Sequence, residues 1–153
     1  MRRYLVVANQ TLTDDELVRV IGERANAQPS TFFIVVPATP MVEMWVEAMM
    51  MPYGGVPYNP YSPKQARELA EERLKTATAQ LRAAGATVDG QVGDPDPVRA
   101  VEGALRVKEF DEIIVSTLPR RISKWLHQDL PRRLEQKFGL PVTQVITVKH
   151  AAH

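Results

Sequence analysis

Five short segments that favour β-strands alternate along the chain with segments whose apolar residues recur at helical spacing. Several of these strand segments are continuously apolar, which is typical of strands buried on both faces of a parallel sheet. Strands that are joined through helices run parallel, and their right-handed crossovers place helices on both faces of the sheet. We therefore predict a single-domain α/β fold, a doubly wound five-stranded parallel sheet between two helical layers, with strands near 4–8, 32–36, 86–92, 113–115 and 142–148.

Local signals predict where the helices begin and break. Thr13 and Glu16 have the spacing of a capping box at the start of the first helix. Ser62-Pro63 and Asp96-Pro97 each combine an N-cap residue with proline at the first helical position. Pro131 falls inside the apolar stripe of the last helix, so we expect a kink or a fresh helix start there.

Composition excludes several classes of function. The chain of 153 residues has no cysteine, which removes disulfides, thiolate metal sites and cysteine nucleophiles. It has no apolar run of about 20 residues and its first residues turn polar too early for a signal peptide, so we expect a cytoplasmic protein. Its net charge of +1 gives no global attraction to nucleic acid or to a membrane. Between Thr117 and Phe138, however, the local net charge is +4, which suggests a local anion-binding surface.

In a doubly wound sheet, ligands bind outside the carboxyl ends of the strands, where the winding direction reverses. The loops that leave these ends begin at Asn9, Pro37, Gly93 and Ser116. We therefore expect any ligand site to lie among these four positions.

The order of elements, the Gly93 loop after the third strand and the ending Leu140-Pro141-Val142 resemble the universal stress protein family. The resemblance spans residues 1–149 and leaves a tail at 150–153. It implies a five-stranded α/β fold, and in many members a dimer formed through the last strands. In the nucleotide-binding branch, a G-x2-G-x9-G-[ST] motif follows the fourth strand, and its glycines let backbone amides surround the ATP phosphates.

This chain departs from that motif at every defining position. The same spacing falls on Ser116, Pro119 and the pair Asp129-Leu130. The acidic residue that follows the family's first strand is replaced by Asn9. We therefore do not expect ATP to bind in the family's usual mode, although another adenine nucleotide remains an alternative.

The loop after the fourth strand offers other groups that bind anions. Hydroxyl groups, two arginines and an N-cap serine precede a helix whose N-terminus carries positive partial charge. The hypothetical anion site consists of Ser116, Thr117, Arg120, Arg121 and Ser123. The competing interpretation is a solvated basic loop followed by a capped helix.

Two further segments suggest partners. The segment 37–62 holds five of the six methionines, and Met41, Trp45 and Met49 would share one face of a short helix. This face suits a lid over the site, a protein interface or the closure of the core. The last strand is apolar and lies at an edge in the family's strand order, which favours a homodimer through Val142, Val145, Ile146 and Val148.

We therefore predict a non-enzymatic, universal-stress-like protein that acts as a ligand sensor or a protein adaptor. Any ligand would be an anionic metabolite or a variant nucleotide. The alternatives are a nucleotide-binding protein or weak phosphate-ester hydrolase of the same fold, and a pure interaction module. The sequence predicts no catalytic residues and no metal ligands: Asp96 is explained by helix capping, and His150 and His153 lie in the tail.

Overall fold

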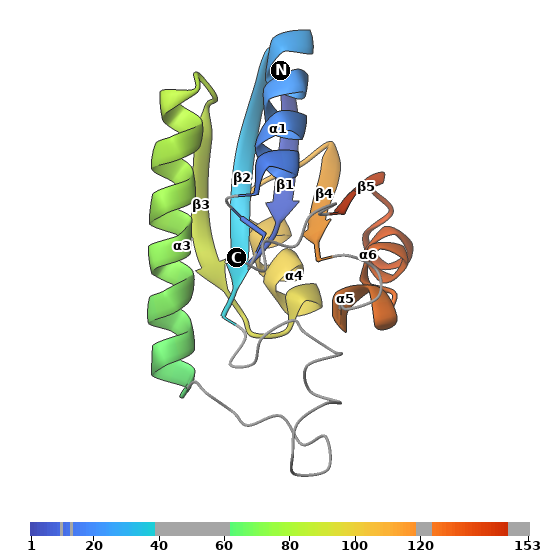
Figure 1. Ribbon diagram of the computed structural model, residues 1–153. Coiled ribbons are helices and arrows are strands. Elements are labelled where there is room, and N and C mark those ends of the chain that lie inside the picture. Colours follow the sequence, from blue (N-terminus) through green and yellow to red (C-terminus); the bar gives the residue numbers. More distant parts are fainter. Residues whose placement is uncertain (10, 13, 39–61, 119–123, 147–153) are drawn as a thin grey trace.

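The computed structural model describes residues 1–9, 11–12, 14–38, 62–118 and 124–146. Five parallel strands form one sheet in the order β3-β2-β1-β4-β5. In Figure 1, the arrowheads of β1, β3 and β4 point to the same lower edge, which is the carboxyl edge of the sheet. The predicted doubly wound parallel sheet is confirmed, and its strands are β1 (Arg2–Val7), β2 (Ser30–Pro37), β3 (Val88–Gly93), β4 (Glu112–Thr117) and β5 (Val142–Ile146).

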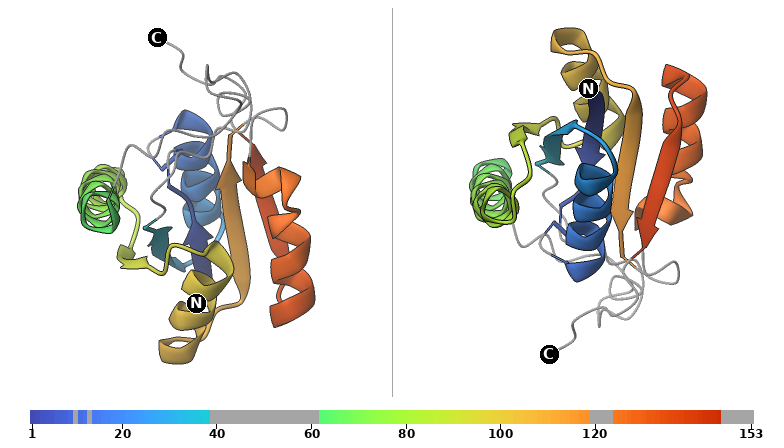
Figure 2. Two further views of the ribbon diagram at one scale, coloured as in Figure 1. Left: turned by 90° about the horizontal axis from the view of Figure 1, so that it is seen from below. Right: turned by 90° about the horizontal axis from the view of Figure 1, so that it is seen from above.

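The helices lie in two layers, one on each face of the sheet (Figure 2). Helices α1 (Asp15–Ala27) and α3 (Pro63–Ala83) cover one face. Helices α4 (Pro97–Val107), α5 (Lys124–His127) and α6 (Leu130–Phe138) cover the other. The chain winds from β1 to β3 through the first layer and reverses between β1 and β4, so the topological switch point lies between these two strands.

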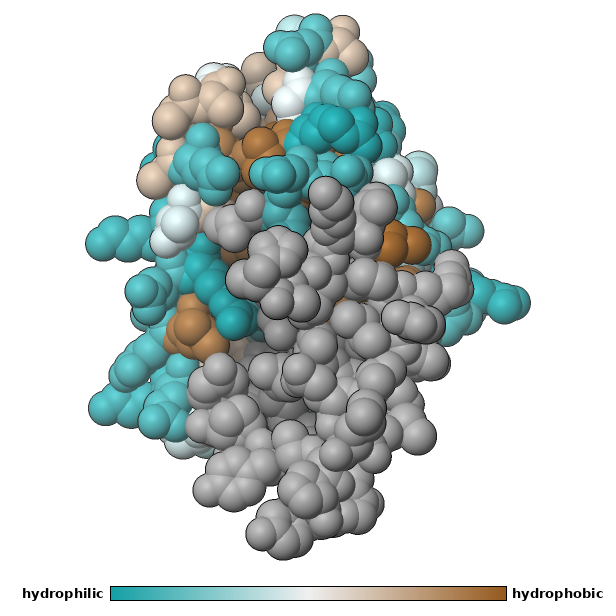
Figure 3. All heavy atoms as spheres, viewed as in Figure 1, coloured by the Kyte–Doolittle hydropathy of each residue, from teal (hydrophilic) through white to brown (hydrophobic). Residues whose placement is uncertain are grey.

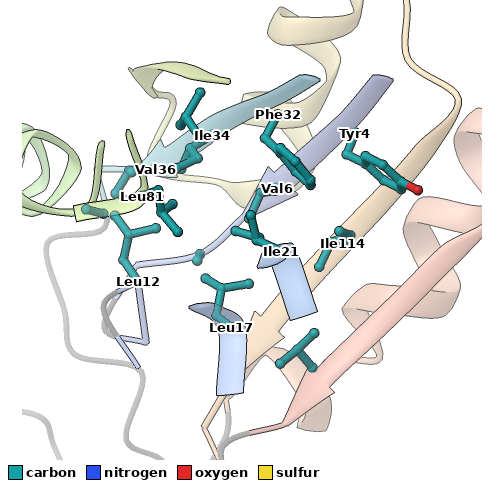
Figure 4. Close-up of a cluster of buried hydrophobic side chains, with 14 of the residues drawn as sticks. Tyr4, Val6, Leu12, Leu17, Ile21, Phe32, Ile34, Val36, Leu81 and Ile114 are labelled. Atoms are coloured by element: carbon teal, nitrogen blue, oxygen red, sulfur yellow. The ribbon is translucent and has the colours of Figure 1, made fainter. Parts of the chain in front are cut away.

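Each face of the sheet has its own hydrophobic core, because successive strand residues point to opposite faces. On the first face, Leu17 and Ile21 of α1 are fully buried against the strands. Figure 4 shows Tyr4 and Phe32 side by side in this core, and their rings stack with centroids 5.1 Å apart. On the second face, Leu130 and Leu134 of α6 are buried with apolar residues of β1, β2 and β4.

Most of the predicted helix signals are confirmed. Ser62 accepts from the backbone N–H of Gln65, whose side chain accepts in return from the backbone N–H of Ser62. Asp96 caps α4 by accepting from the N–H of Val98 at 3.1 Å. The break near Pro131 is a fresh helix start, since α6 begins at Leu130 with proline in its first turn.

The predicted capping box at the first helix depends on Thr13, which lies outside the described residues. The helix α1 begins one residue later than a Thr13 cap requires, with Asp14 at the N-cap position. Asp14 has extended backbone angles but forms no side-chain capping bond. The spacing signal misplaced the boundary because several consecutive polar residues, Asp14, Asp15 and Glu16, are all good helix-start residues.

The outer surfaces of the helices are polar. On the face that Figure 3 shows, most of the described surface is hydrophilic, and hydrophobic groups are exposed only in scattered places. No helix in the described ranges is long and apolar enough to span a membrane.

Candidate functional site

The predicted loop positions lie level with one another at the carboxyl edge of the sheet. Pro37 pairs with Gly93, and Thr117 pairs with Ile146. Val7 of β1 pairs with Val35 and with Val115. Asn9 lies two residues beyond Val7, so it comes level with Pro37 and Thr117. One row therefore crosses the sheet, and it consists of Gly93, Pro37, Asn9, Thr117 and Ile146.

Asn9 occupies the centre of this row and is 8% exposed. Its Nδ2 donates to the carbonyl oxygen of Pro37 at 2.7 Å, which ties the end of β1 to the end of β2. Its Oδ1 accepts a hydrogen bond from Nη1 of Arg73, which reaches across from α3. Arg73 was missed by the sequence reasoning, because nothing local links a mid-helix arginine to an asparagine 64 residues away.

The hydroxyl groups at the end of β4 differ in their pairing. Ser116 is 1% exposed, and its Oγ lies 2.6 Å from Oγ1 of Thr11, in a hydrogen bond that either residue can donate. This bond ties the loop after β1 to the end of β4 across the switch point. Thr117 is fully buried, and its Oγ1 finds no hydrogen-bond partner in the described part of the chain. Buried polar groups are rarely left unpaired, so Thr117 requires an explanation.

Gly93 has a packing role at this edge. A Cβ built on Gly93 would lie 2.9 Å from Cβ of Ala100 and 2.9 Å from Cγ2 of Val35. Contacts this short do not occur, so only glycine lets α4 approach the end of β3 this closely.

The remaining members of the predicted anion site, Arg120, Arg121 and Ser123, lie outside the described residues. So do Met41, Trp45 and Met49, which formed the predicted partner surface. Asp129, which aligns with a motif glycine, has a left-handed backbone with φ of 57°. Aspartate is among the few non-glycine residues that tolerate this conformation.

Helix N-termini add positive partial charge to the carboxyl edge. Each of the long helices runs antiparallel to its strands, so α1, α3, α4 and α6 begin at this edge. Acidic groups partly offset this charge, since Asp15 and Glu16 lie in the first turn of α1 and Asp96 caps α4. Within the described ranges, no group of three or more acidic or histidine side chains could hold a metal ion.

A second polar cluster lies at the opposite, amino-terminal edge. Glu112 at the start of β4 accepts from Oγ1 of Thr143 at 2.6 Å and from Nη2 of Arg2 at 3.0 Å, and it pairs with Arg24 at 3.2 Å. Burial by itself would raise the pKa of Glu112, but these hydrogen bonds and the charges of Arg24 and Arg2 lower it below its ordinary value. The cluster holds β1, β4, β5 and α1 together, so its role is structural.

Strand β5 lies at an edge of the sheet, as predicted. Two of its apolar side chains, however, are used inside the protein. Val145 is 5% exposed in the first core, and Val142 packs against the second. Val148 lies outside the described residues. A groove of about 420 Å³ runs between β5 and α1, and two acidic and two basic residues line it.

Comparison with known proteins gives its result at the level of the fold. No protein-family model matches the chain, and no curated protein matches its sequence. A universal stress protein family member from Burkholderia pseudomallei superposes with a TM-score of 0.59 at 17% identity, covering 94% of each chain. The universal stress protein from Archaeoglobus fulgidus in complex with dAMP gives 0.59 at 16% identity, covering 95% of this chain and 97% of that one.

A family member from Arabidopsis thaliana with AMP bound gives a TM-score of 0.58 at 11% identity, covering 99% of this chain and 94% of that chain. The chain has the universal stress protein fold. The predicted resemblance is thus confirmed for the fold, over almost the whole chain. In this universal stress protein fold, the row through Asn9 and Thr117 lies at the switch point, where open α/β sheets bind ligands.

Proposed function

We propose that this chain is a ligand-binding protein, a sensor or adaptor, that holds an anionic, nucleotide-like ligand at the carboxyl ends of β1 and β4. The observation that carries the proposal is the hydroxyl of Thr117. It is fully buried at the last residue of β4, beside the switch point, and it has no hydrogen-bond partner in the described residues. An unpaired buried hydroxyl costs about 1–3 kcal/mol, a cost that a ligand offering a polar atom would remove.

Two further observations support an anionic ligand. The N-termini of α1, α3, α4 and α6 lie at the same edge of the sheet, and the Arg73 side chain reaches Asn9 there. Two structures of the same fold contain adenine nucleotides, dAMP in the archaeal protein and AMP in the plant protein. A nucleoside monophosphate is therefore the first ligand to test.

The test is a calorimetric titration of the purified chain with AMP, adenosine and inorganic phosphate. We expect AMP to bind, and the Thr117→Val variant to bind it more weakly. If the chain bound neither AMP nor phosphate at millimolar concentration, the proposal would be wrong.

A paired set of variants tests the loop after β4. Arg120→Ala/Arg121→Ala removes two charges from the proposed site, whereas Arg132→Ala/Arg133→Ala removes two exposed charges from α6. We expect only the first pair to weaken AMP binding. Unchanged affinity would exclude the two loop arginines from the site.

Incubation with ATP and Mg²⁺ separates the sensor from the alternative, a weak phosphate-ester hydrolase. A sensor releases no phosphate above the background rate, whereas a hydrolase releases it in proportion to enzyme concentration. Steady phosphate release that Thr117→Val abolishes would favour the hydrolase.

We also propose that the chain forms a homodimer through β5. The support is the outer backbone edge of this strand, which pairs with no other strand among the described residues. The side chains of Val142 and Val145 are already used in the two cores, so the dimer would form through backbone pairing. Light scattering at micromolar concentration is expected to give twice the chain mass of 17.2 kDa. A monomer at that concentration would contradict the dimer.

A further inference from the structure

The five-stranded sheet has two outer edges, one formed by β3 and the other by β5 (Figure 1). In a parallel ladder, alternate residues of a strand turn their backbone groups to the same neighbouring strand. The N–H of Phe32 in β2 donates to the carbonyl oxygen of Thr87 at 2.9 Å, so the odd-numbered residues of β3 turn their backbone groups to β2. The outer edge of β3 therefore presents the backbone groups of its even-numbered residues, Val88, Gly90 and Val92.

Side chains of the protein itself already bind two of these outer groups. Arg82, in the last turn of α3, donates from Nε at 3.0 Å and from Nη2 at 2.8 Å to the carbonyl oxygen of Val88. The Oδ1 atom of Asp89 accepts from the N–H of Gly90 at 2.8 Å. These two backbone groups follow one another along the edge, so a partner strand could reach them only by displacing a guanidinium and a carboxylate.

Gly90 is the position where this edge most needs such cover. A Cβ built on Gly90 would lie 2.6 Å from the carbonyl oxygen of Ile34 and 2.8 Å from Cδ1 of Leu74, so only glycine lets β2 and α3 pack this closely. Glycine has no side chain to shield its own N–H from an approaching strand. The side chain of the preceding residue, Asp89, supplies that shield instead.

The edge formed by β5 differs in this respect. The N–H of Ile113 in β4 donates to the carbonyl oxygen of Pro141 at 2.9 Å, so the same alternation turns the backbone groups of Val142, Gln144 and Ile146 outward. Within the described ranges, no side chain forms a hydrogen bond with these outward groups of β5. Among the described residues, therefore, only the β3 edge is covered by side chains that bind its backbone.

We propose that Arg82 and Asp89 close the β3 edge to a second copy of this chain, so that copies pair through one edge of the sheet only. Uncovered strand edges pair readily with one another, and charged side chains along an edge prevent this. Closure matters because a chain with two self-pairing edges would join copies through each edge in turn, which builds open-ended assemblies in place of a closed pair. This inference rests on the proposed homodimer only for the number of copies that assemble.

The experiment measures the mass of the full chain by light scattering over a hundredfold range of concentration. Arg82→Ala/Asp89→Ala removes both covering side chains, and we expect its mean mass to rise with concentration to at least one and a half times that of the unmodified chain. Arg106→Ala/Asp94→Ala is the matched control. Arg106 also lies in the last turn of a helix, α4, and Asp94 also accepts from a nearby backbone N–H, that of Asp96 at 2.9 Å, but in the loop after β3. The control is expected to keep the mass of the unmodified chain.

Amide exchange shows where the variant assembles. Pairing through β3 should slow exchange at Val88, Gly90 and Val92 at least tenfold between the lowest and the highest concentration. Arg82→Lys/Asp89→Asn keeps a donor and an acceptor at the edge, so it should assemble less than the alanine pair. The single variants Arg82→Ala and Asp89→Ala, each expected to assemble more than the control, keep the test decisive if the double variant does not fold.

The outcomes separate this inference from the proposed homodimer. If the unmodified chain is a monomer and the double variant is a dimer protected at β3, the homodimer is wrong and the inference stands. If the double variant keeps the mass of the unmodified chain at every concentration, the inference is wrong and the homodimer is unaffected. Equal assembly of the control, or assembly without protection of the β3 amides, would show a general effect of lost surface charge and would also overturn the inference.

Discussion

Two threonines at the carboxyl edge are expected to respond in opposite directions to the same substitution. Thr117 is fully buried without a hydrogen-bond partner in the described residues, whereas Thr11, which is 1% exposed, shares a 2.6 Å hydrogen bond with Ser116. Valine has almost the same shape as threonine and carries a methyl group in place of the hydroxyl, so neither substitution opens a cavity. The difference between the two variants therefore reports the state of the hydroxyl alone.

The expected magnitudes follow from the desolvation of a hydroxyl. Thr117→Val removes an unsatisfied group and should raise the free energy of unfolding of the ligand-free protein by about 1–3 kcal/mol. Thr11→Val leaves Oγ of Ser116 buried without its partner and should lower that free energy by about 1–3 kcal/mol. For a domain of this size, each 1 kcal/mol shifts the melting temperature by about 2–4 °C.

The assay is thermal and urea unfolding of the two variants and the unmodified chain, with and without AMP. We expect Thr117→Val to melt higher than the unmodified chain but to gain less from AMP, because the proposed function assigns this hydroxyl to the ligand. If Thr117→Val destabilises the ligand-free protein as much as Thr11→Val, the hydroxyl of Thr117 is satisfied within the chain, and the reasoning is refuted.

Three further predictions concern stability. Gly93→Ala should lower the free energy of unfolding by about 1–3 kcal/mol in urea titrations, because the added Cβ overpacks the contact with α4. In the control Gly103→Ala, the added Cβ meets nothing within 4 Å, so this variant should raise the free energy of unfolding by about 0.5–1 kcal/mol. Equal effects of the two substitutions would contradict the packing role of Gly93. The hydrogen bonds from Arg3 lower the pKa of Asp111 from 3.8 to about 2, so its stabilisation is full above about pH 5 and is lost progressively as the pH falls through 2. Asp111→Asn should flatten that acid limb in unfolding measured from pH 5 to 2, and an unchanged limb would exclude this pair. Ser62→Ala should cost about 1 kcal/mol and speed amide exchange in the first turn of α3, and unaltered exchange there would argue against the capping box.

The fold was predictable because its signals are local. Buried parallel strands need continuous apolar residues, and Phe32 to Val36 has them whatever the rest of the chain does. The Ser62-Pro63 start of α3 and the break at Pro131 likewise depend on backbone chemistry within one turn. The ends of elements were less predictable: α1 starts one residue later than expected, and β3 starts at Val88 where the sequence predicted residue 86.

The candidate site was predictable in place but not in chemistry. Parallel strands end at one edge of a sheet, so Asn9, Pro37 and Thr117 had to come near one another once the topology was known. What each side chain does there depends on partners far away in the sequence. The hydroxyl of Ser116 is taken by Thr11, and Gly93 is required by the approach of Ala100.

The sequence by itself determined the order in which strands and helices follow one another along the chain, because the spacing of apolar residues depends on which faces are buried. Only the tertiary structure brought Arg73 of α3 to Asn9, and only it left Thr117 buried without a described partner. The physical reason is that hydrogen bonds and close contacts act over a few ångströms of space. A chain that folds into three layers creates such neighbours between residues that share no local pattern.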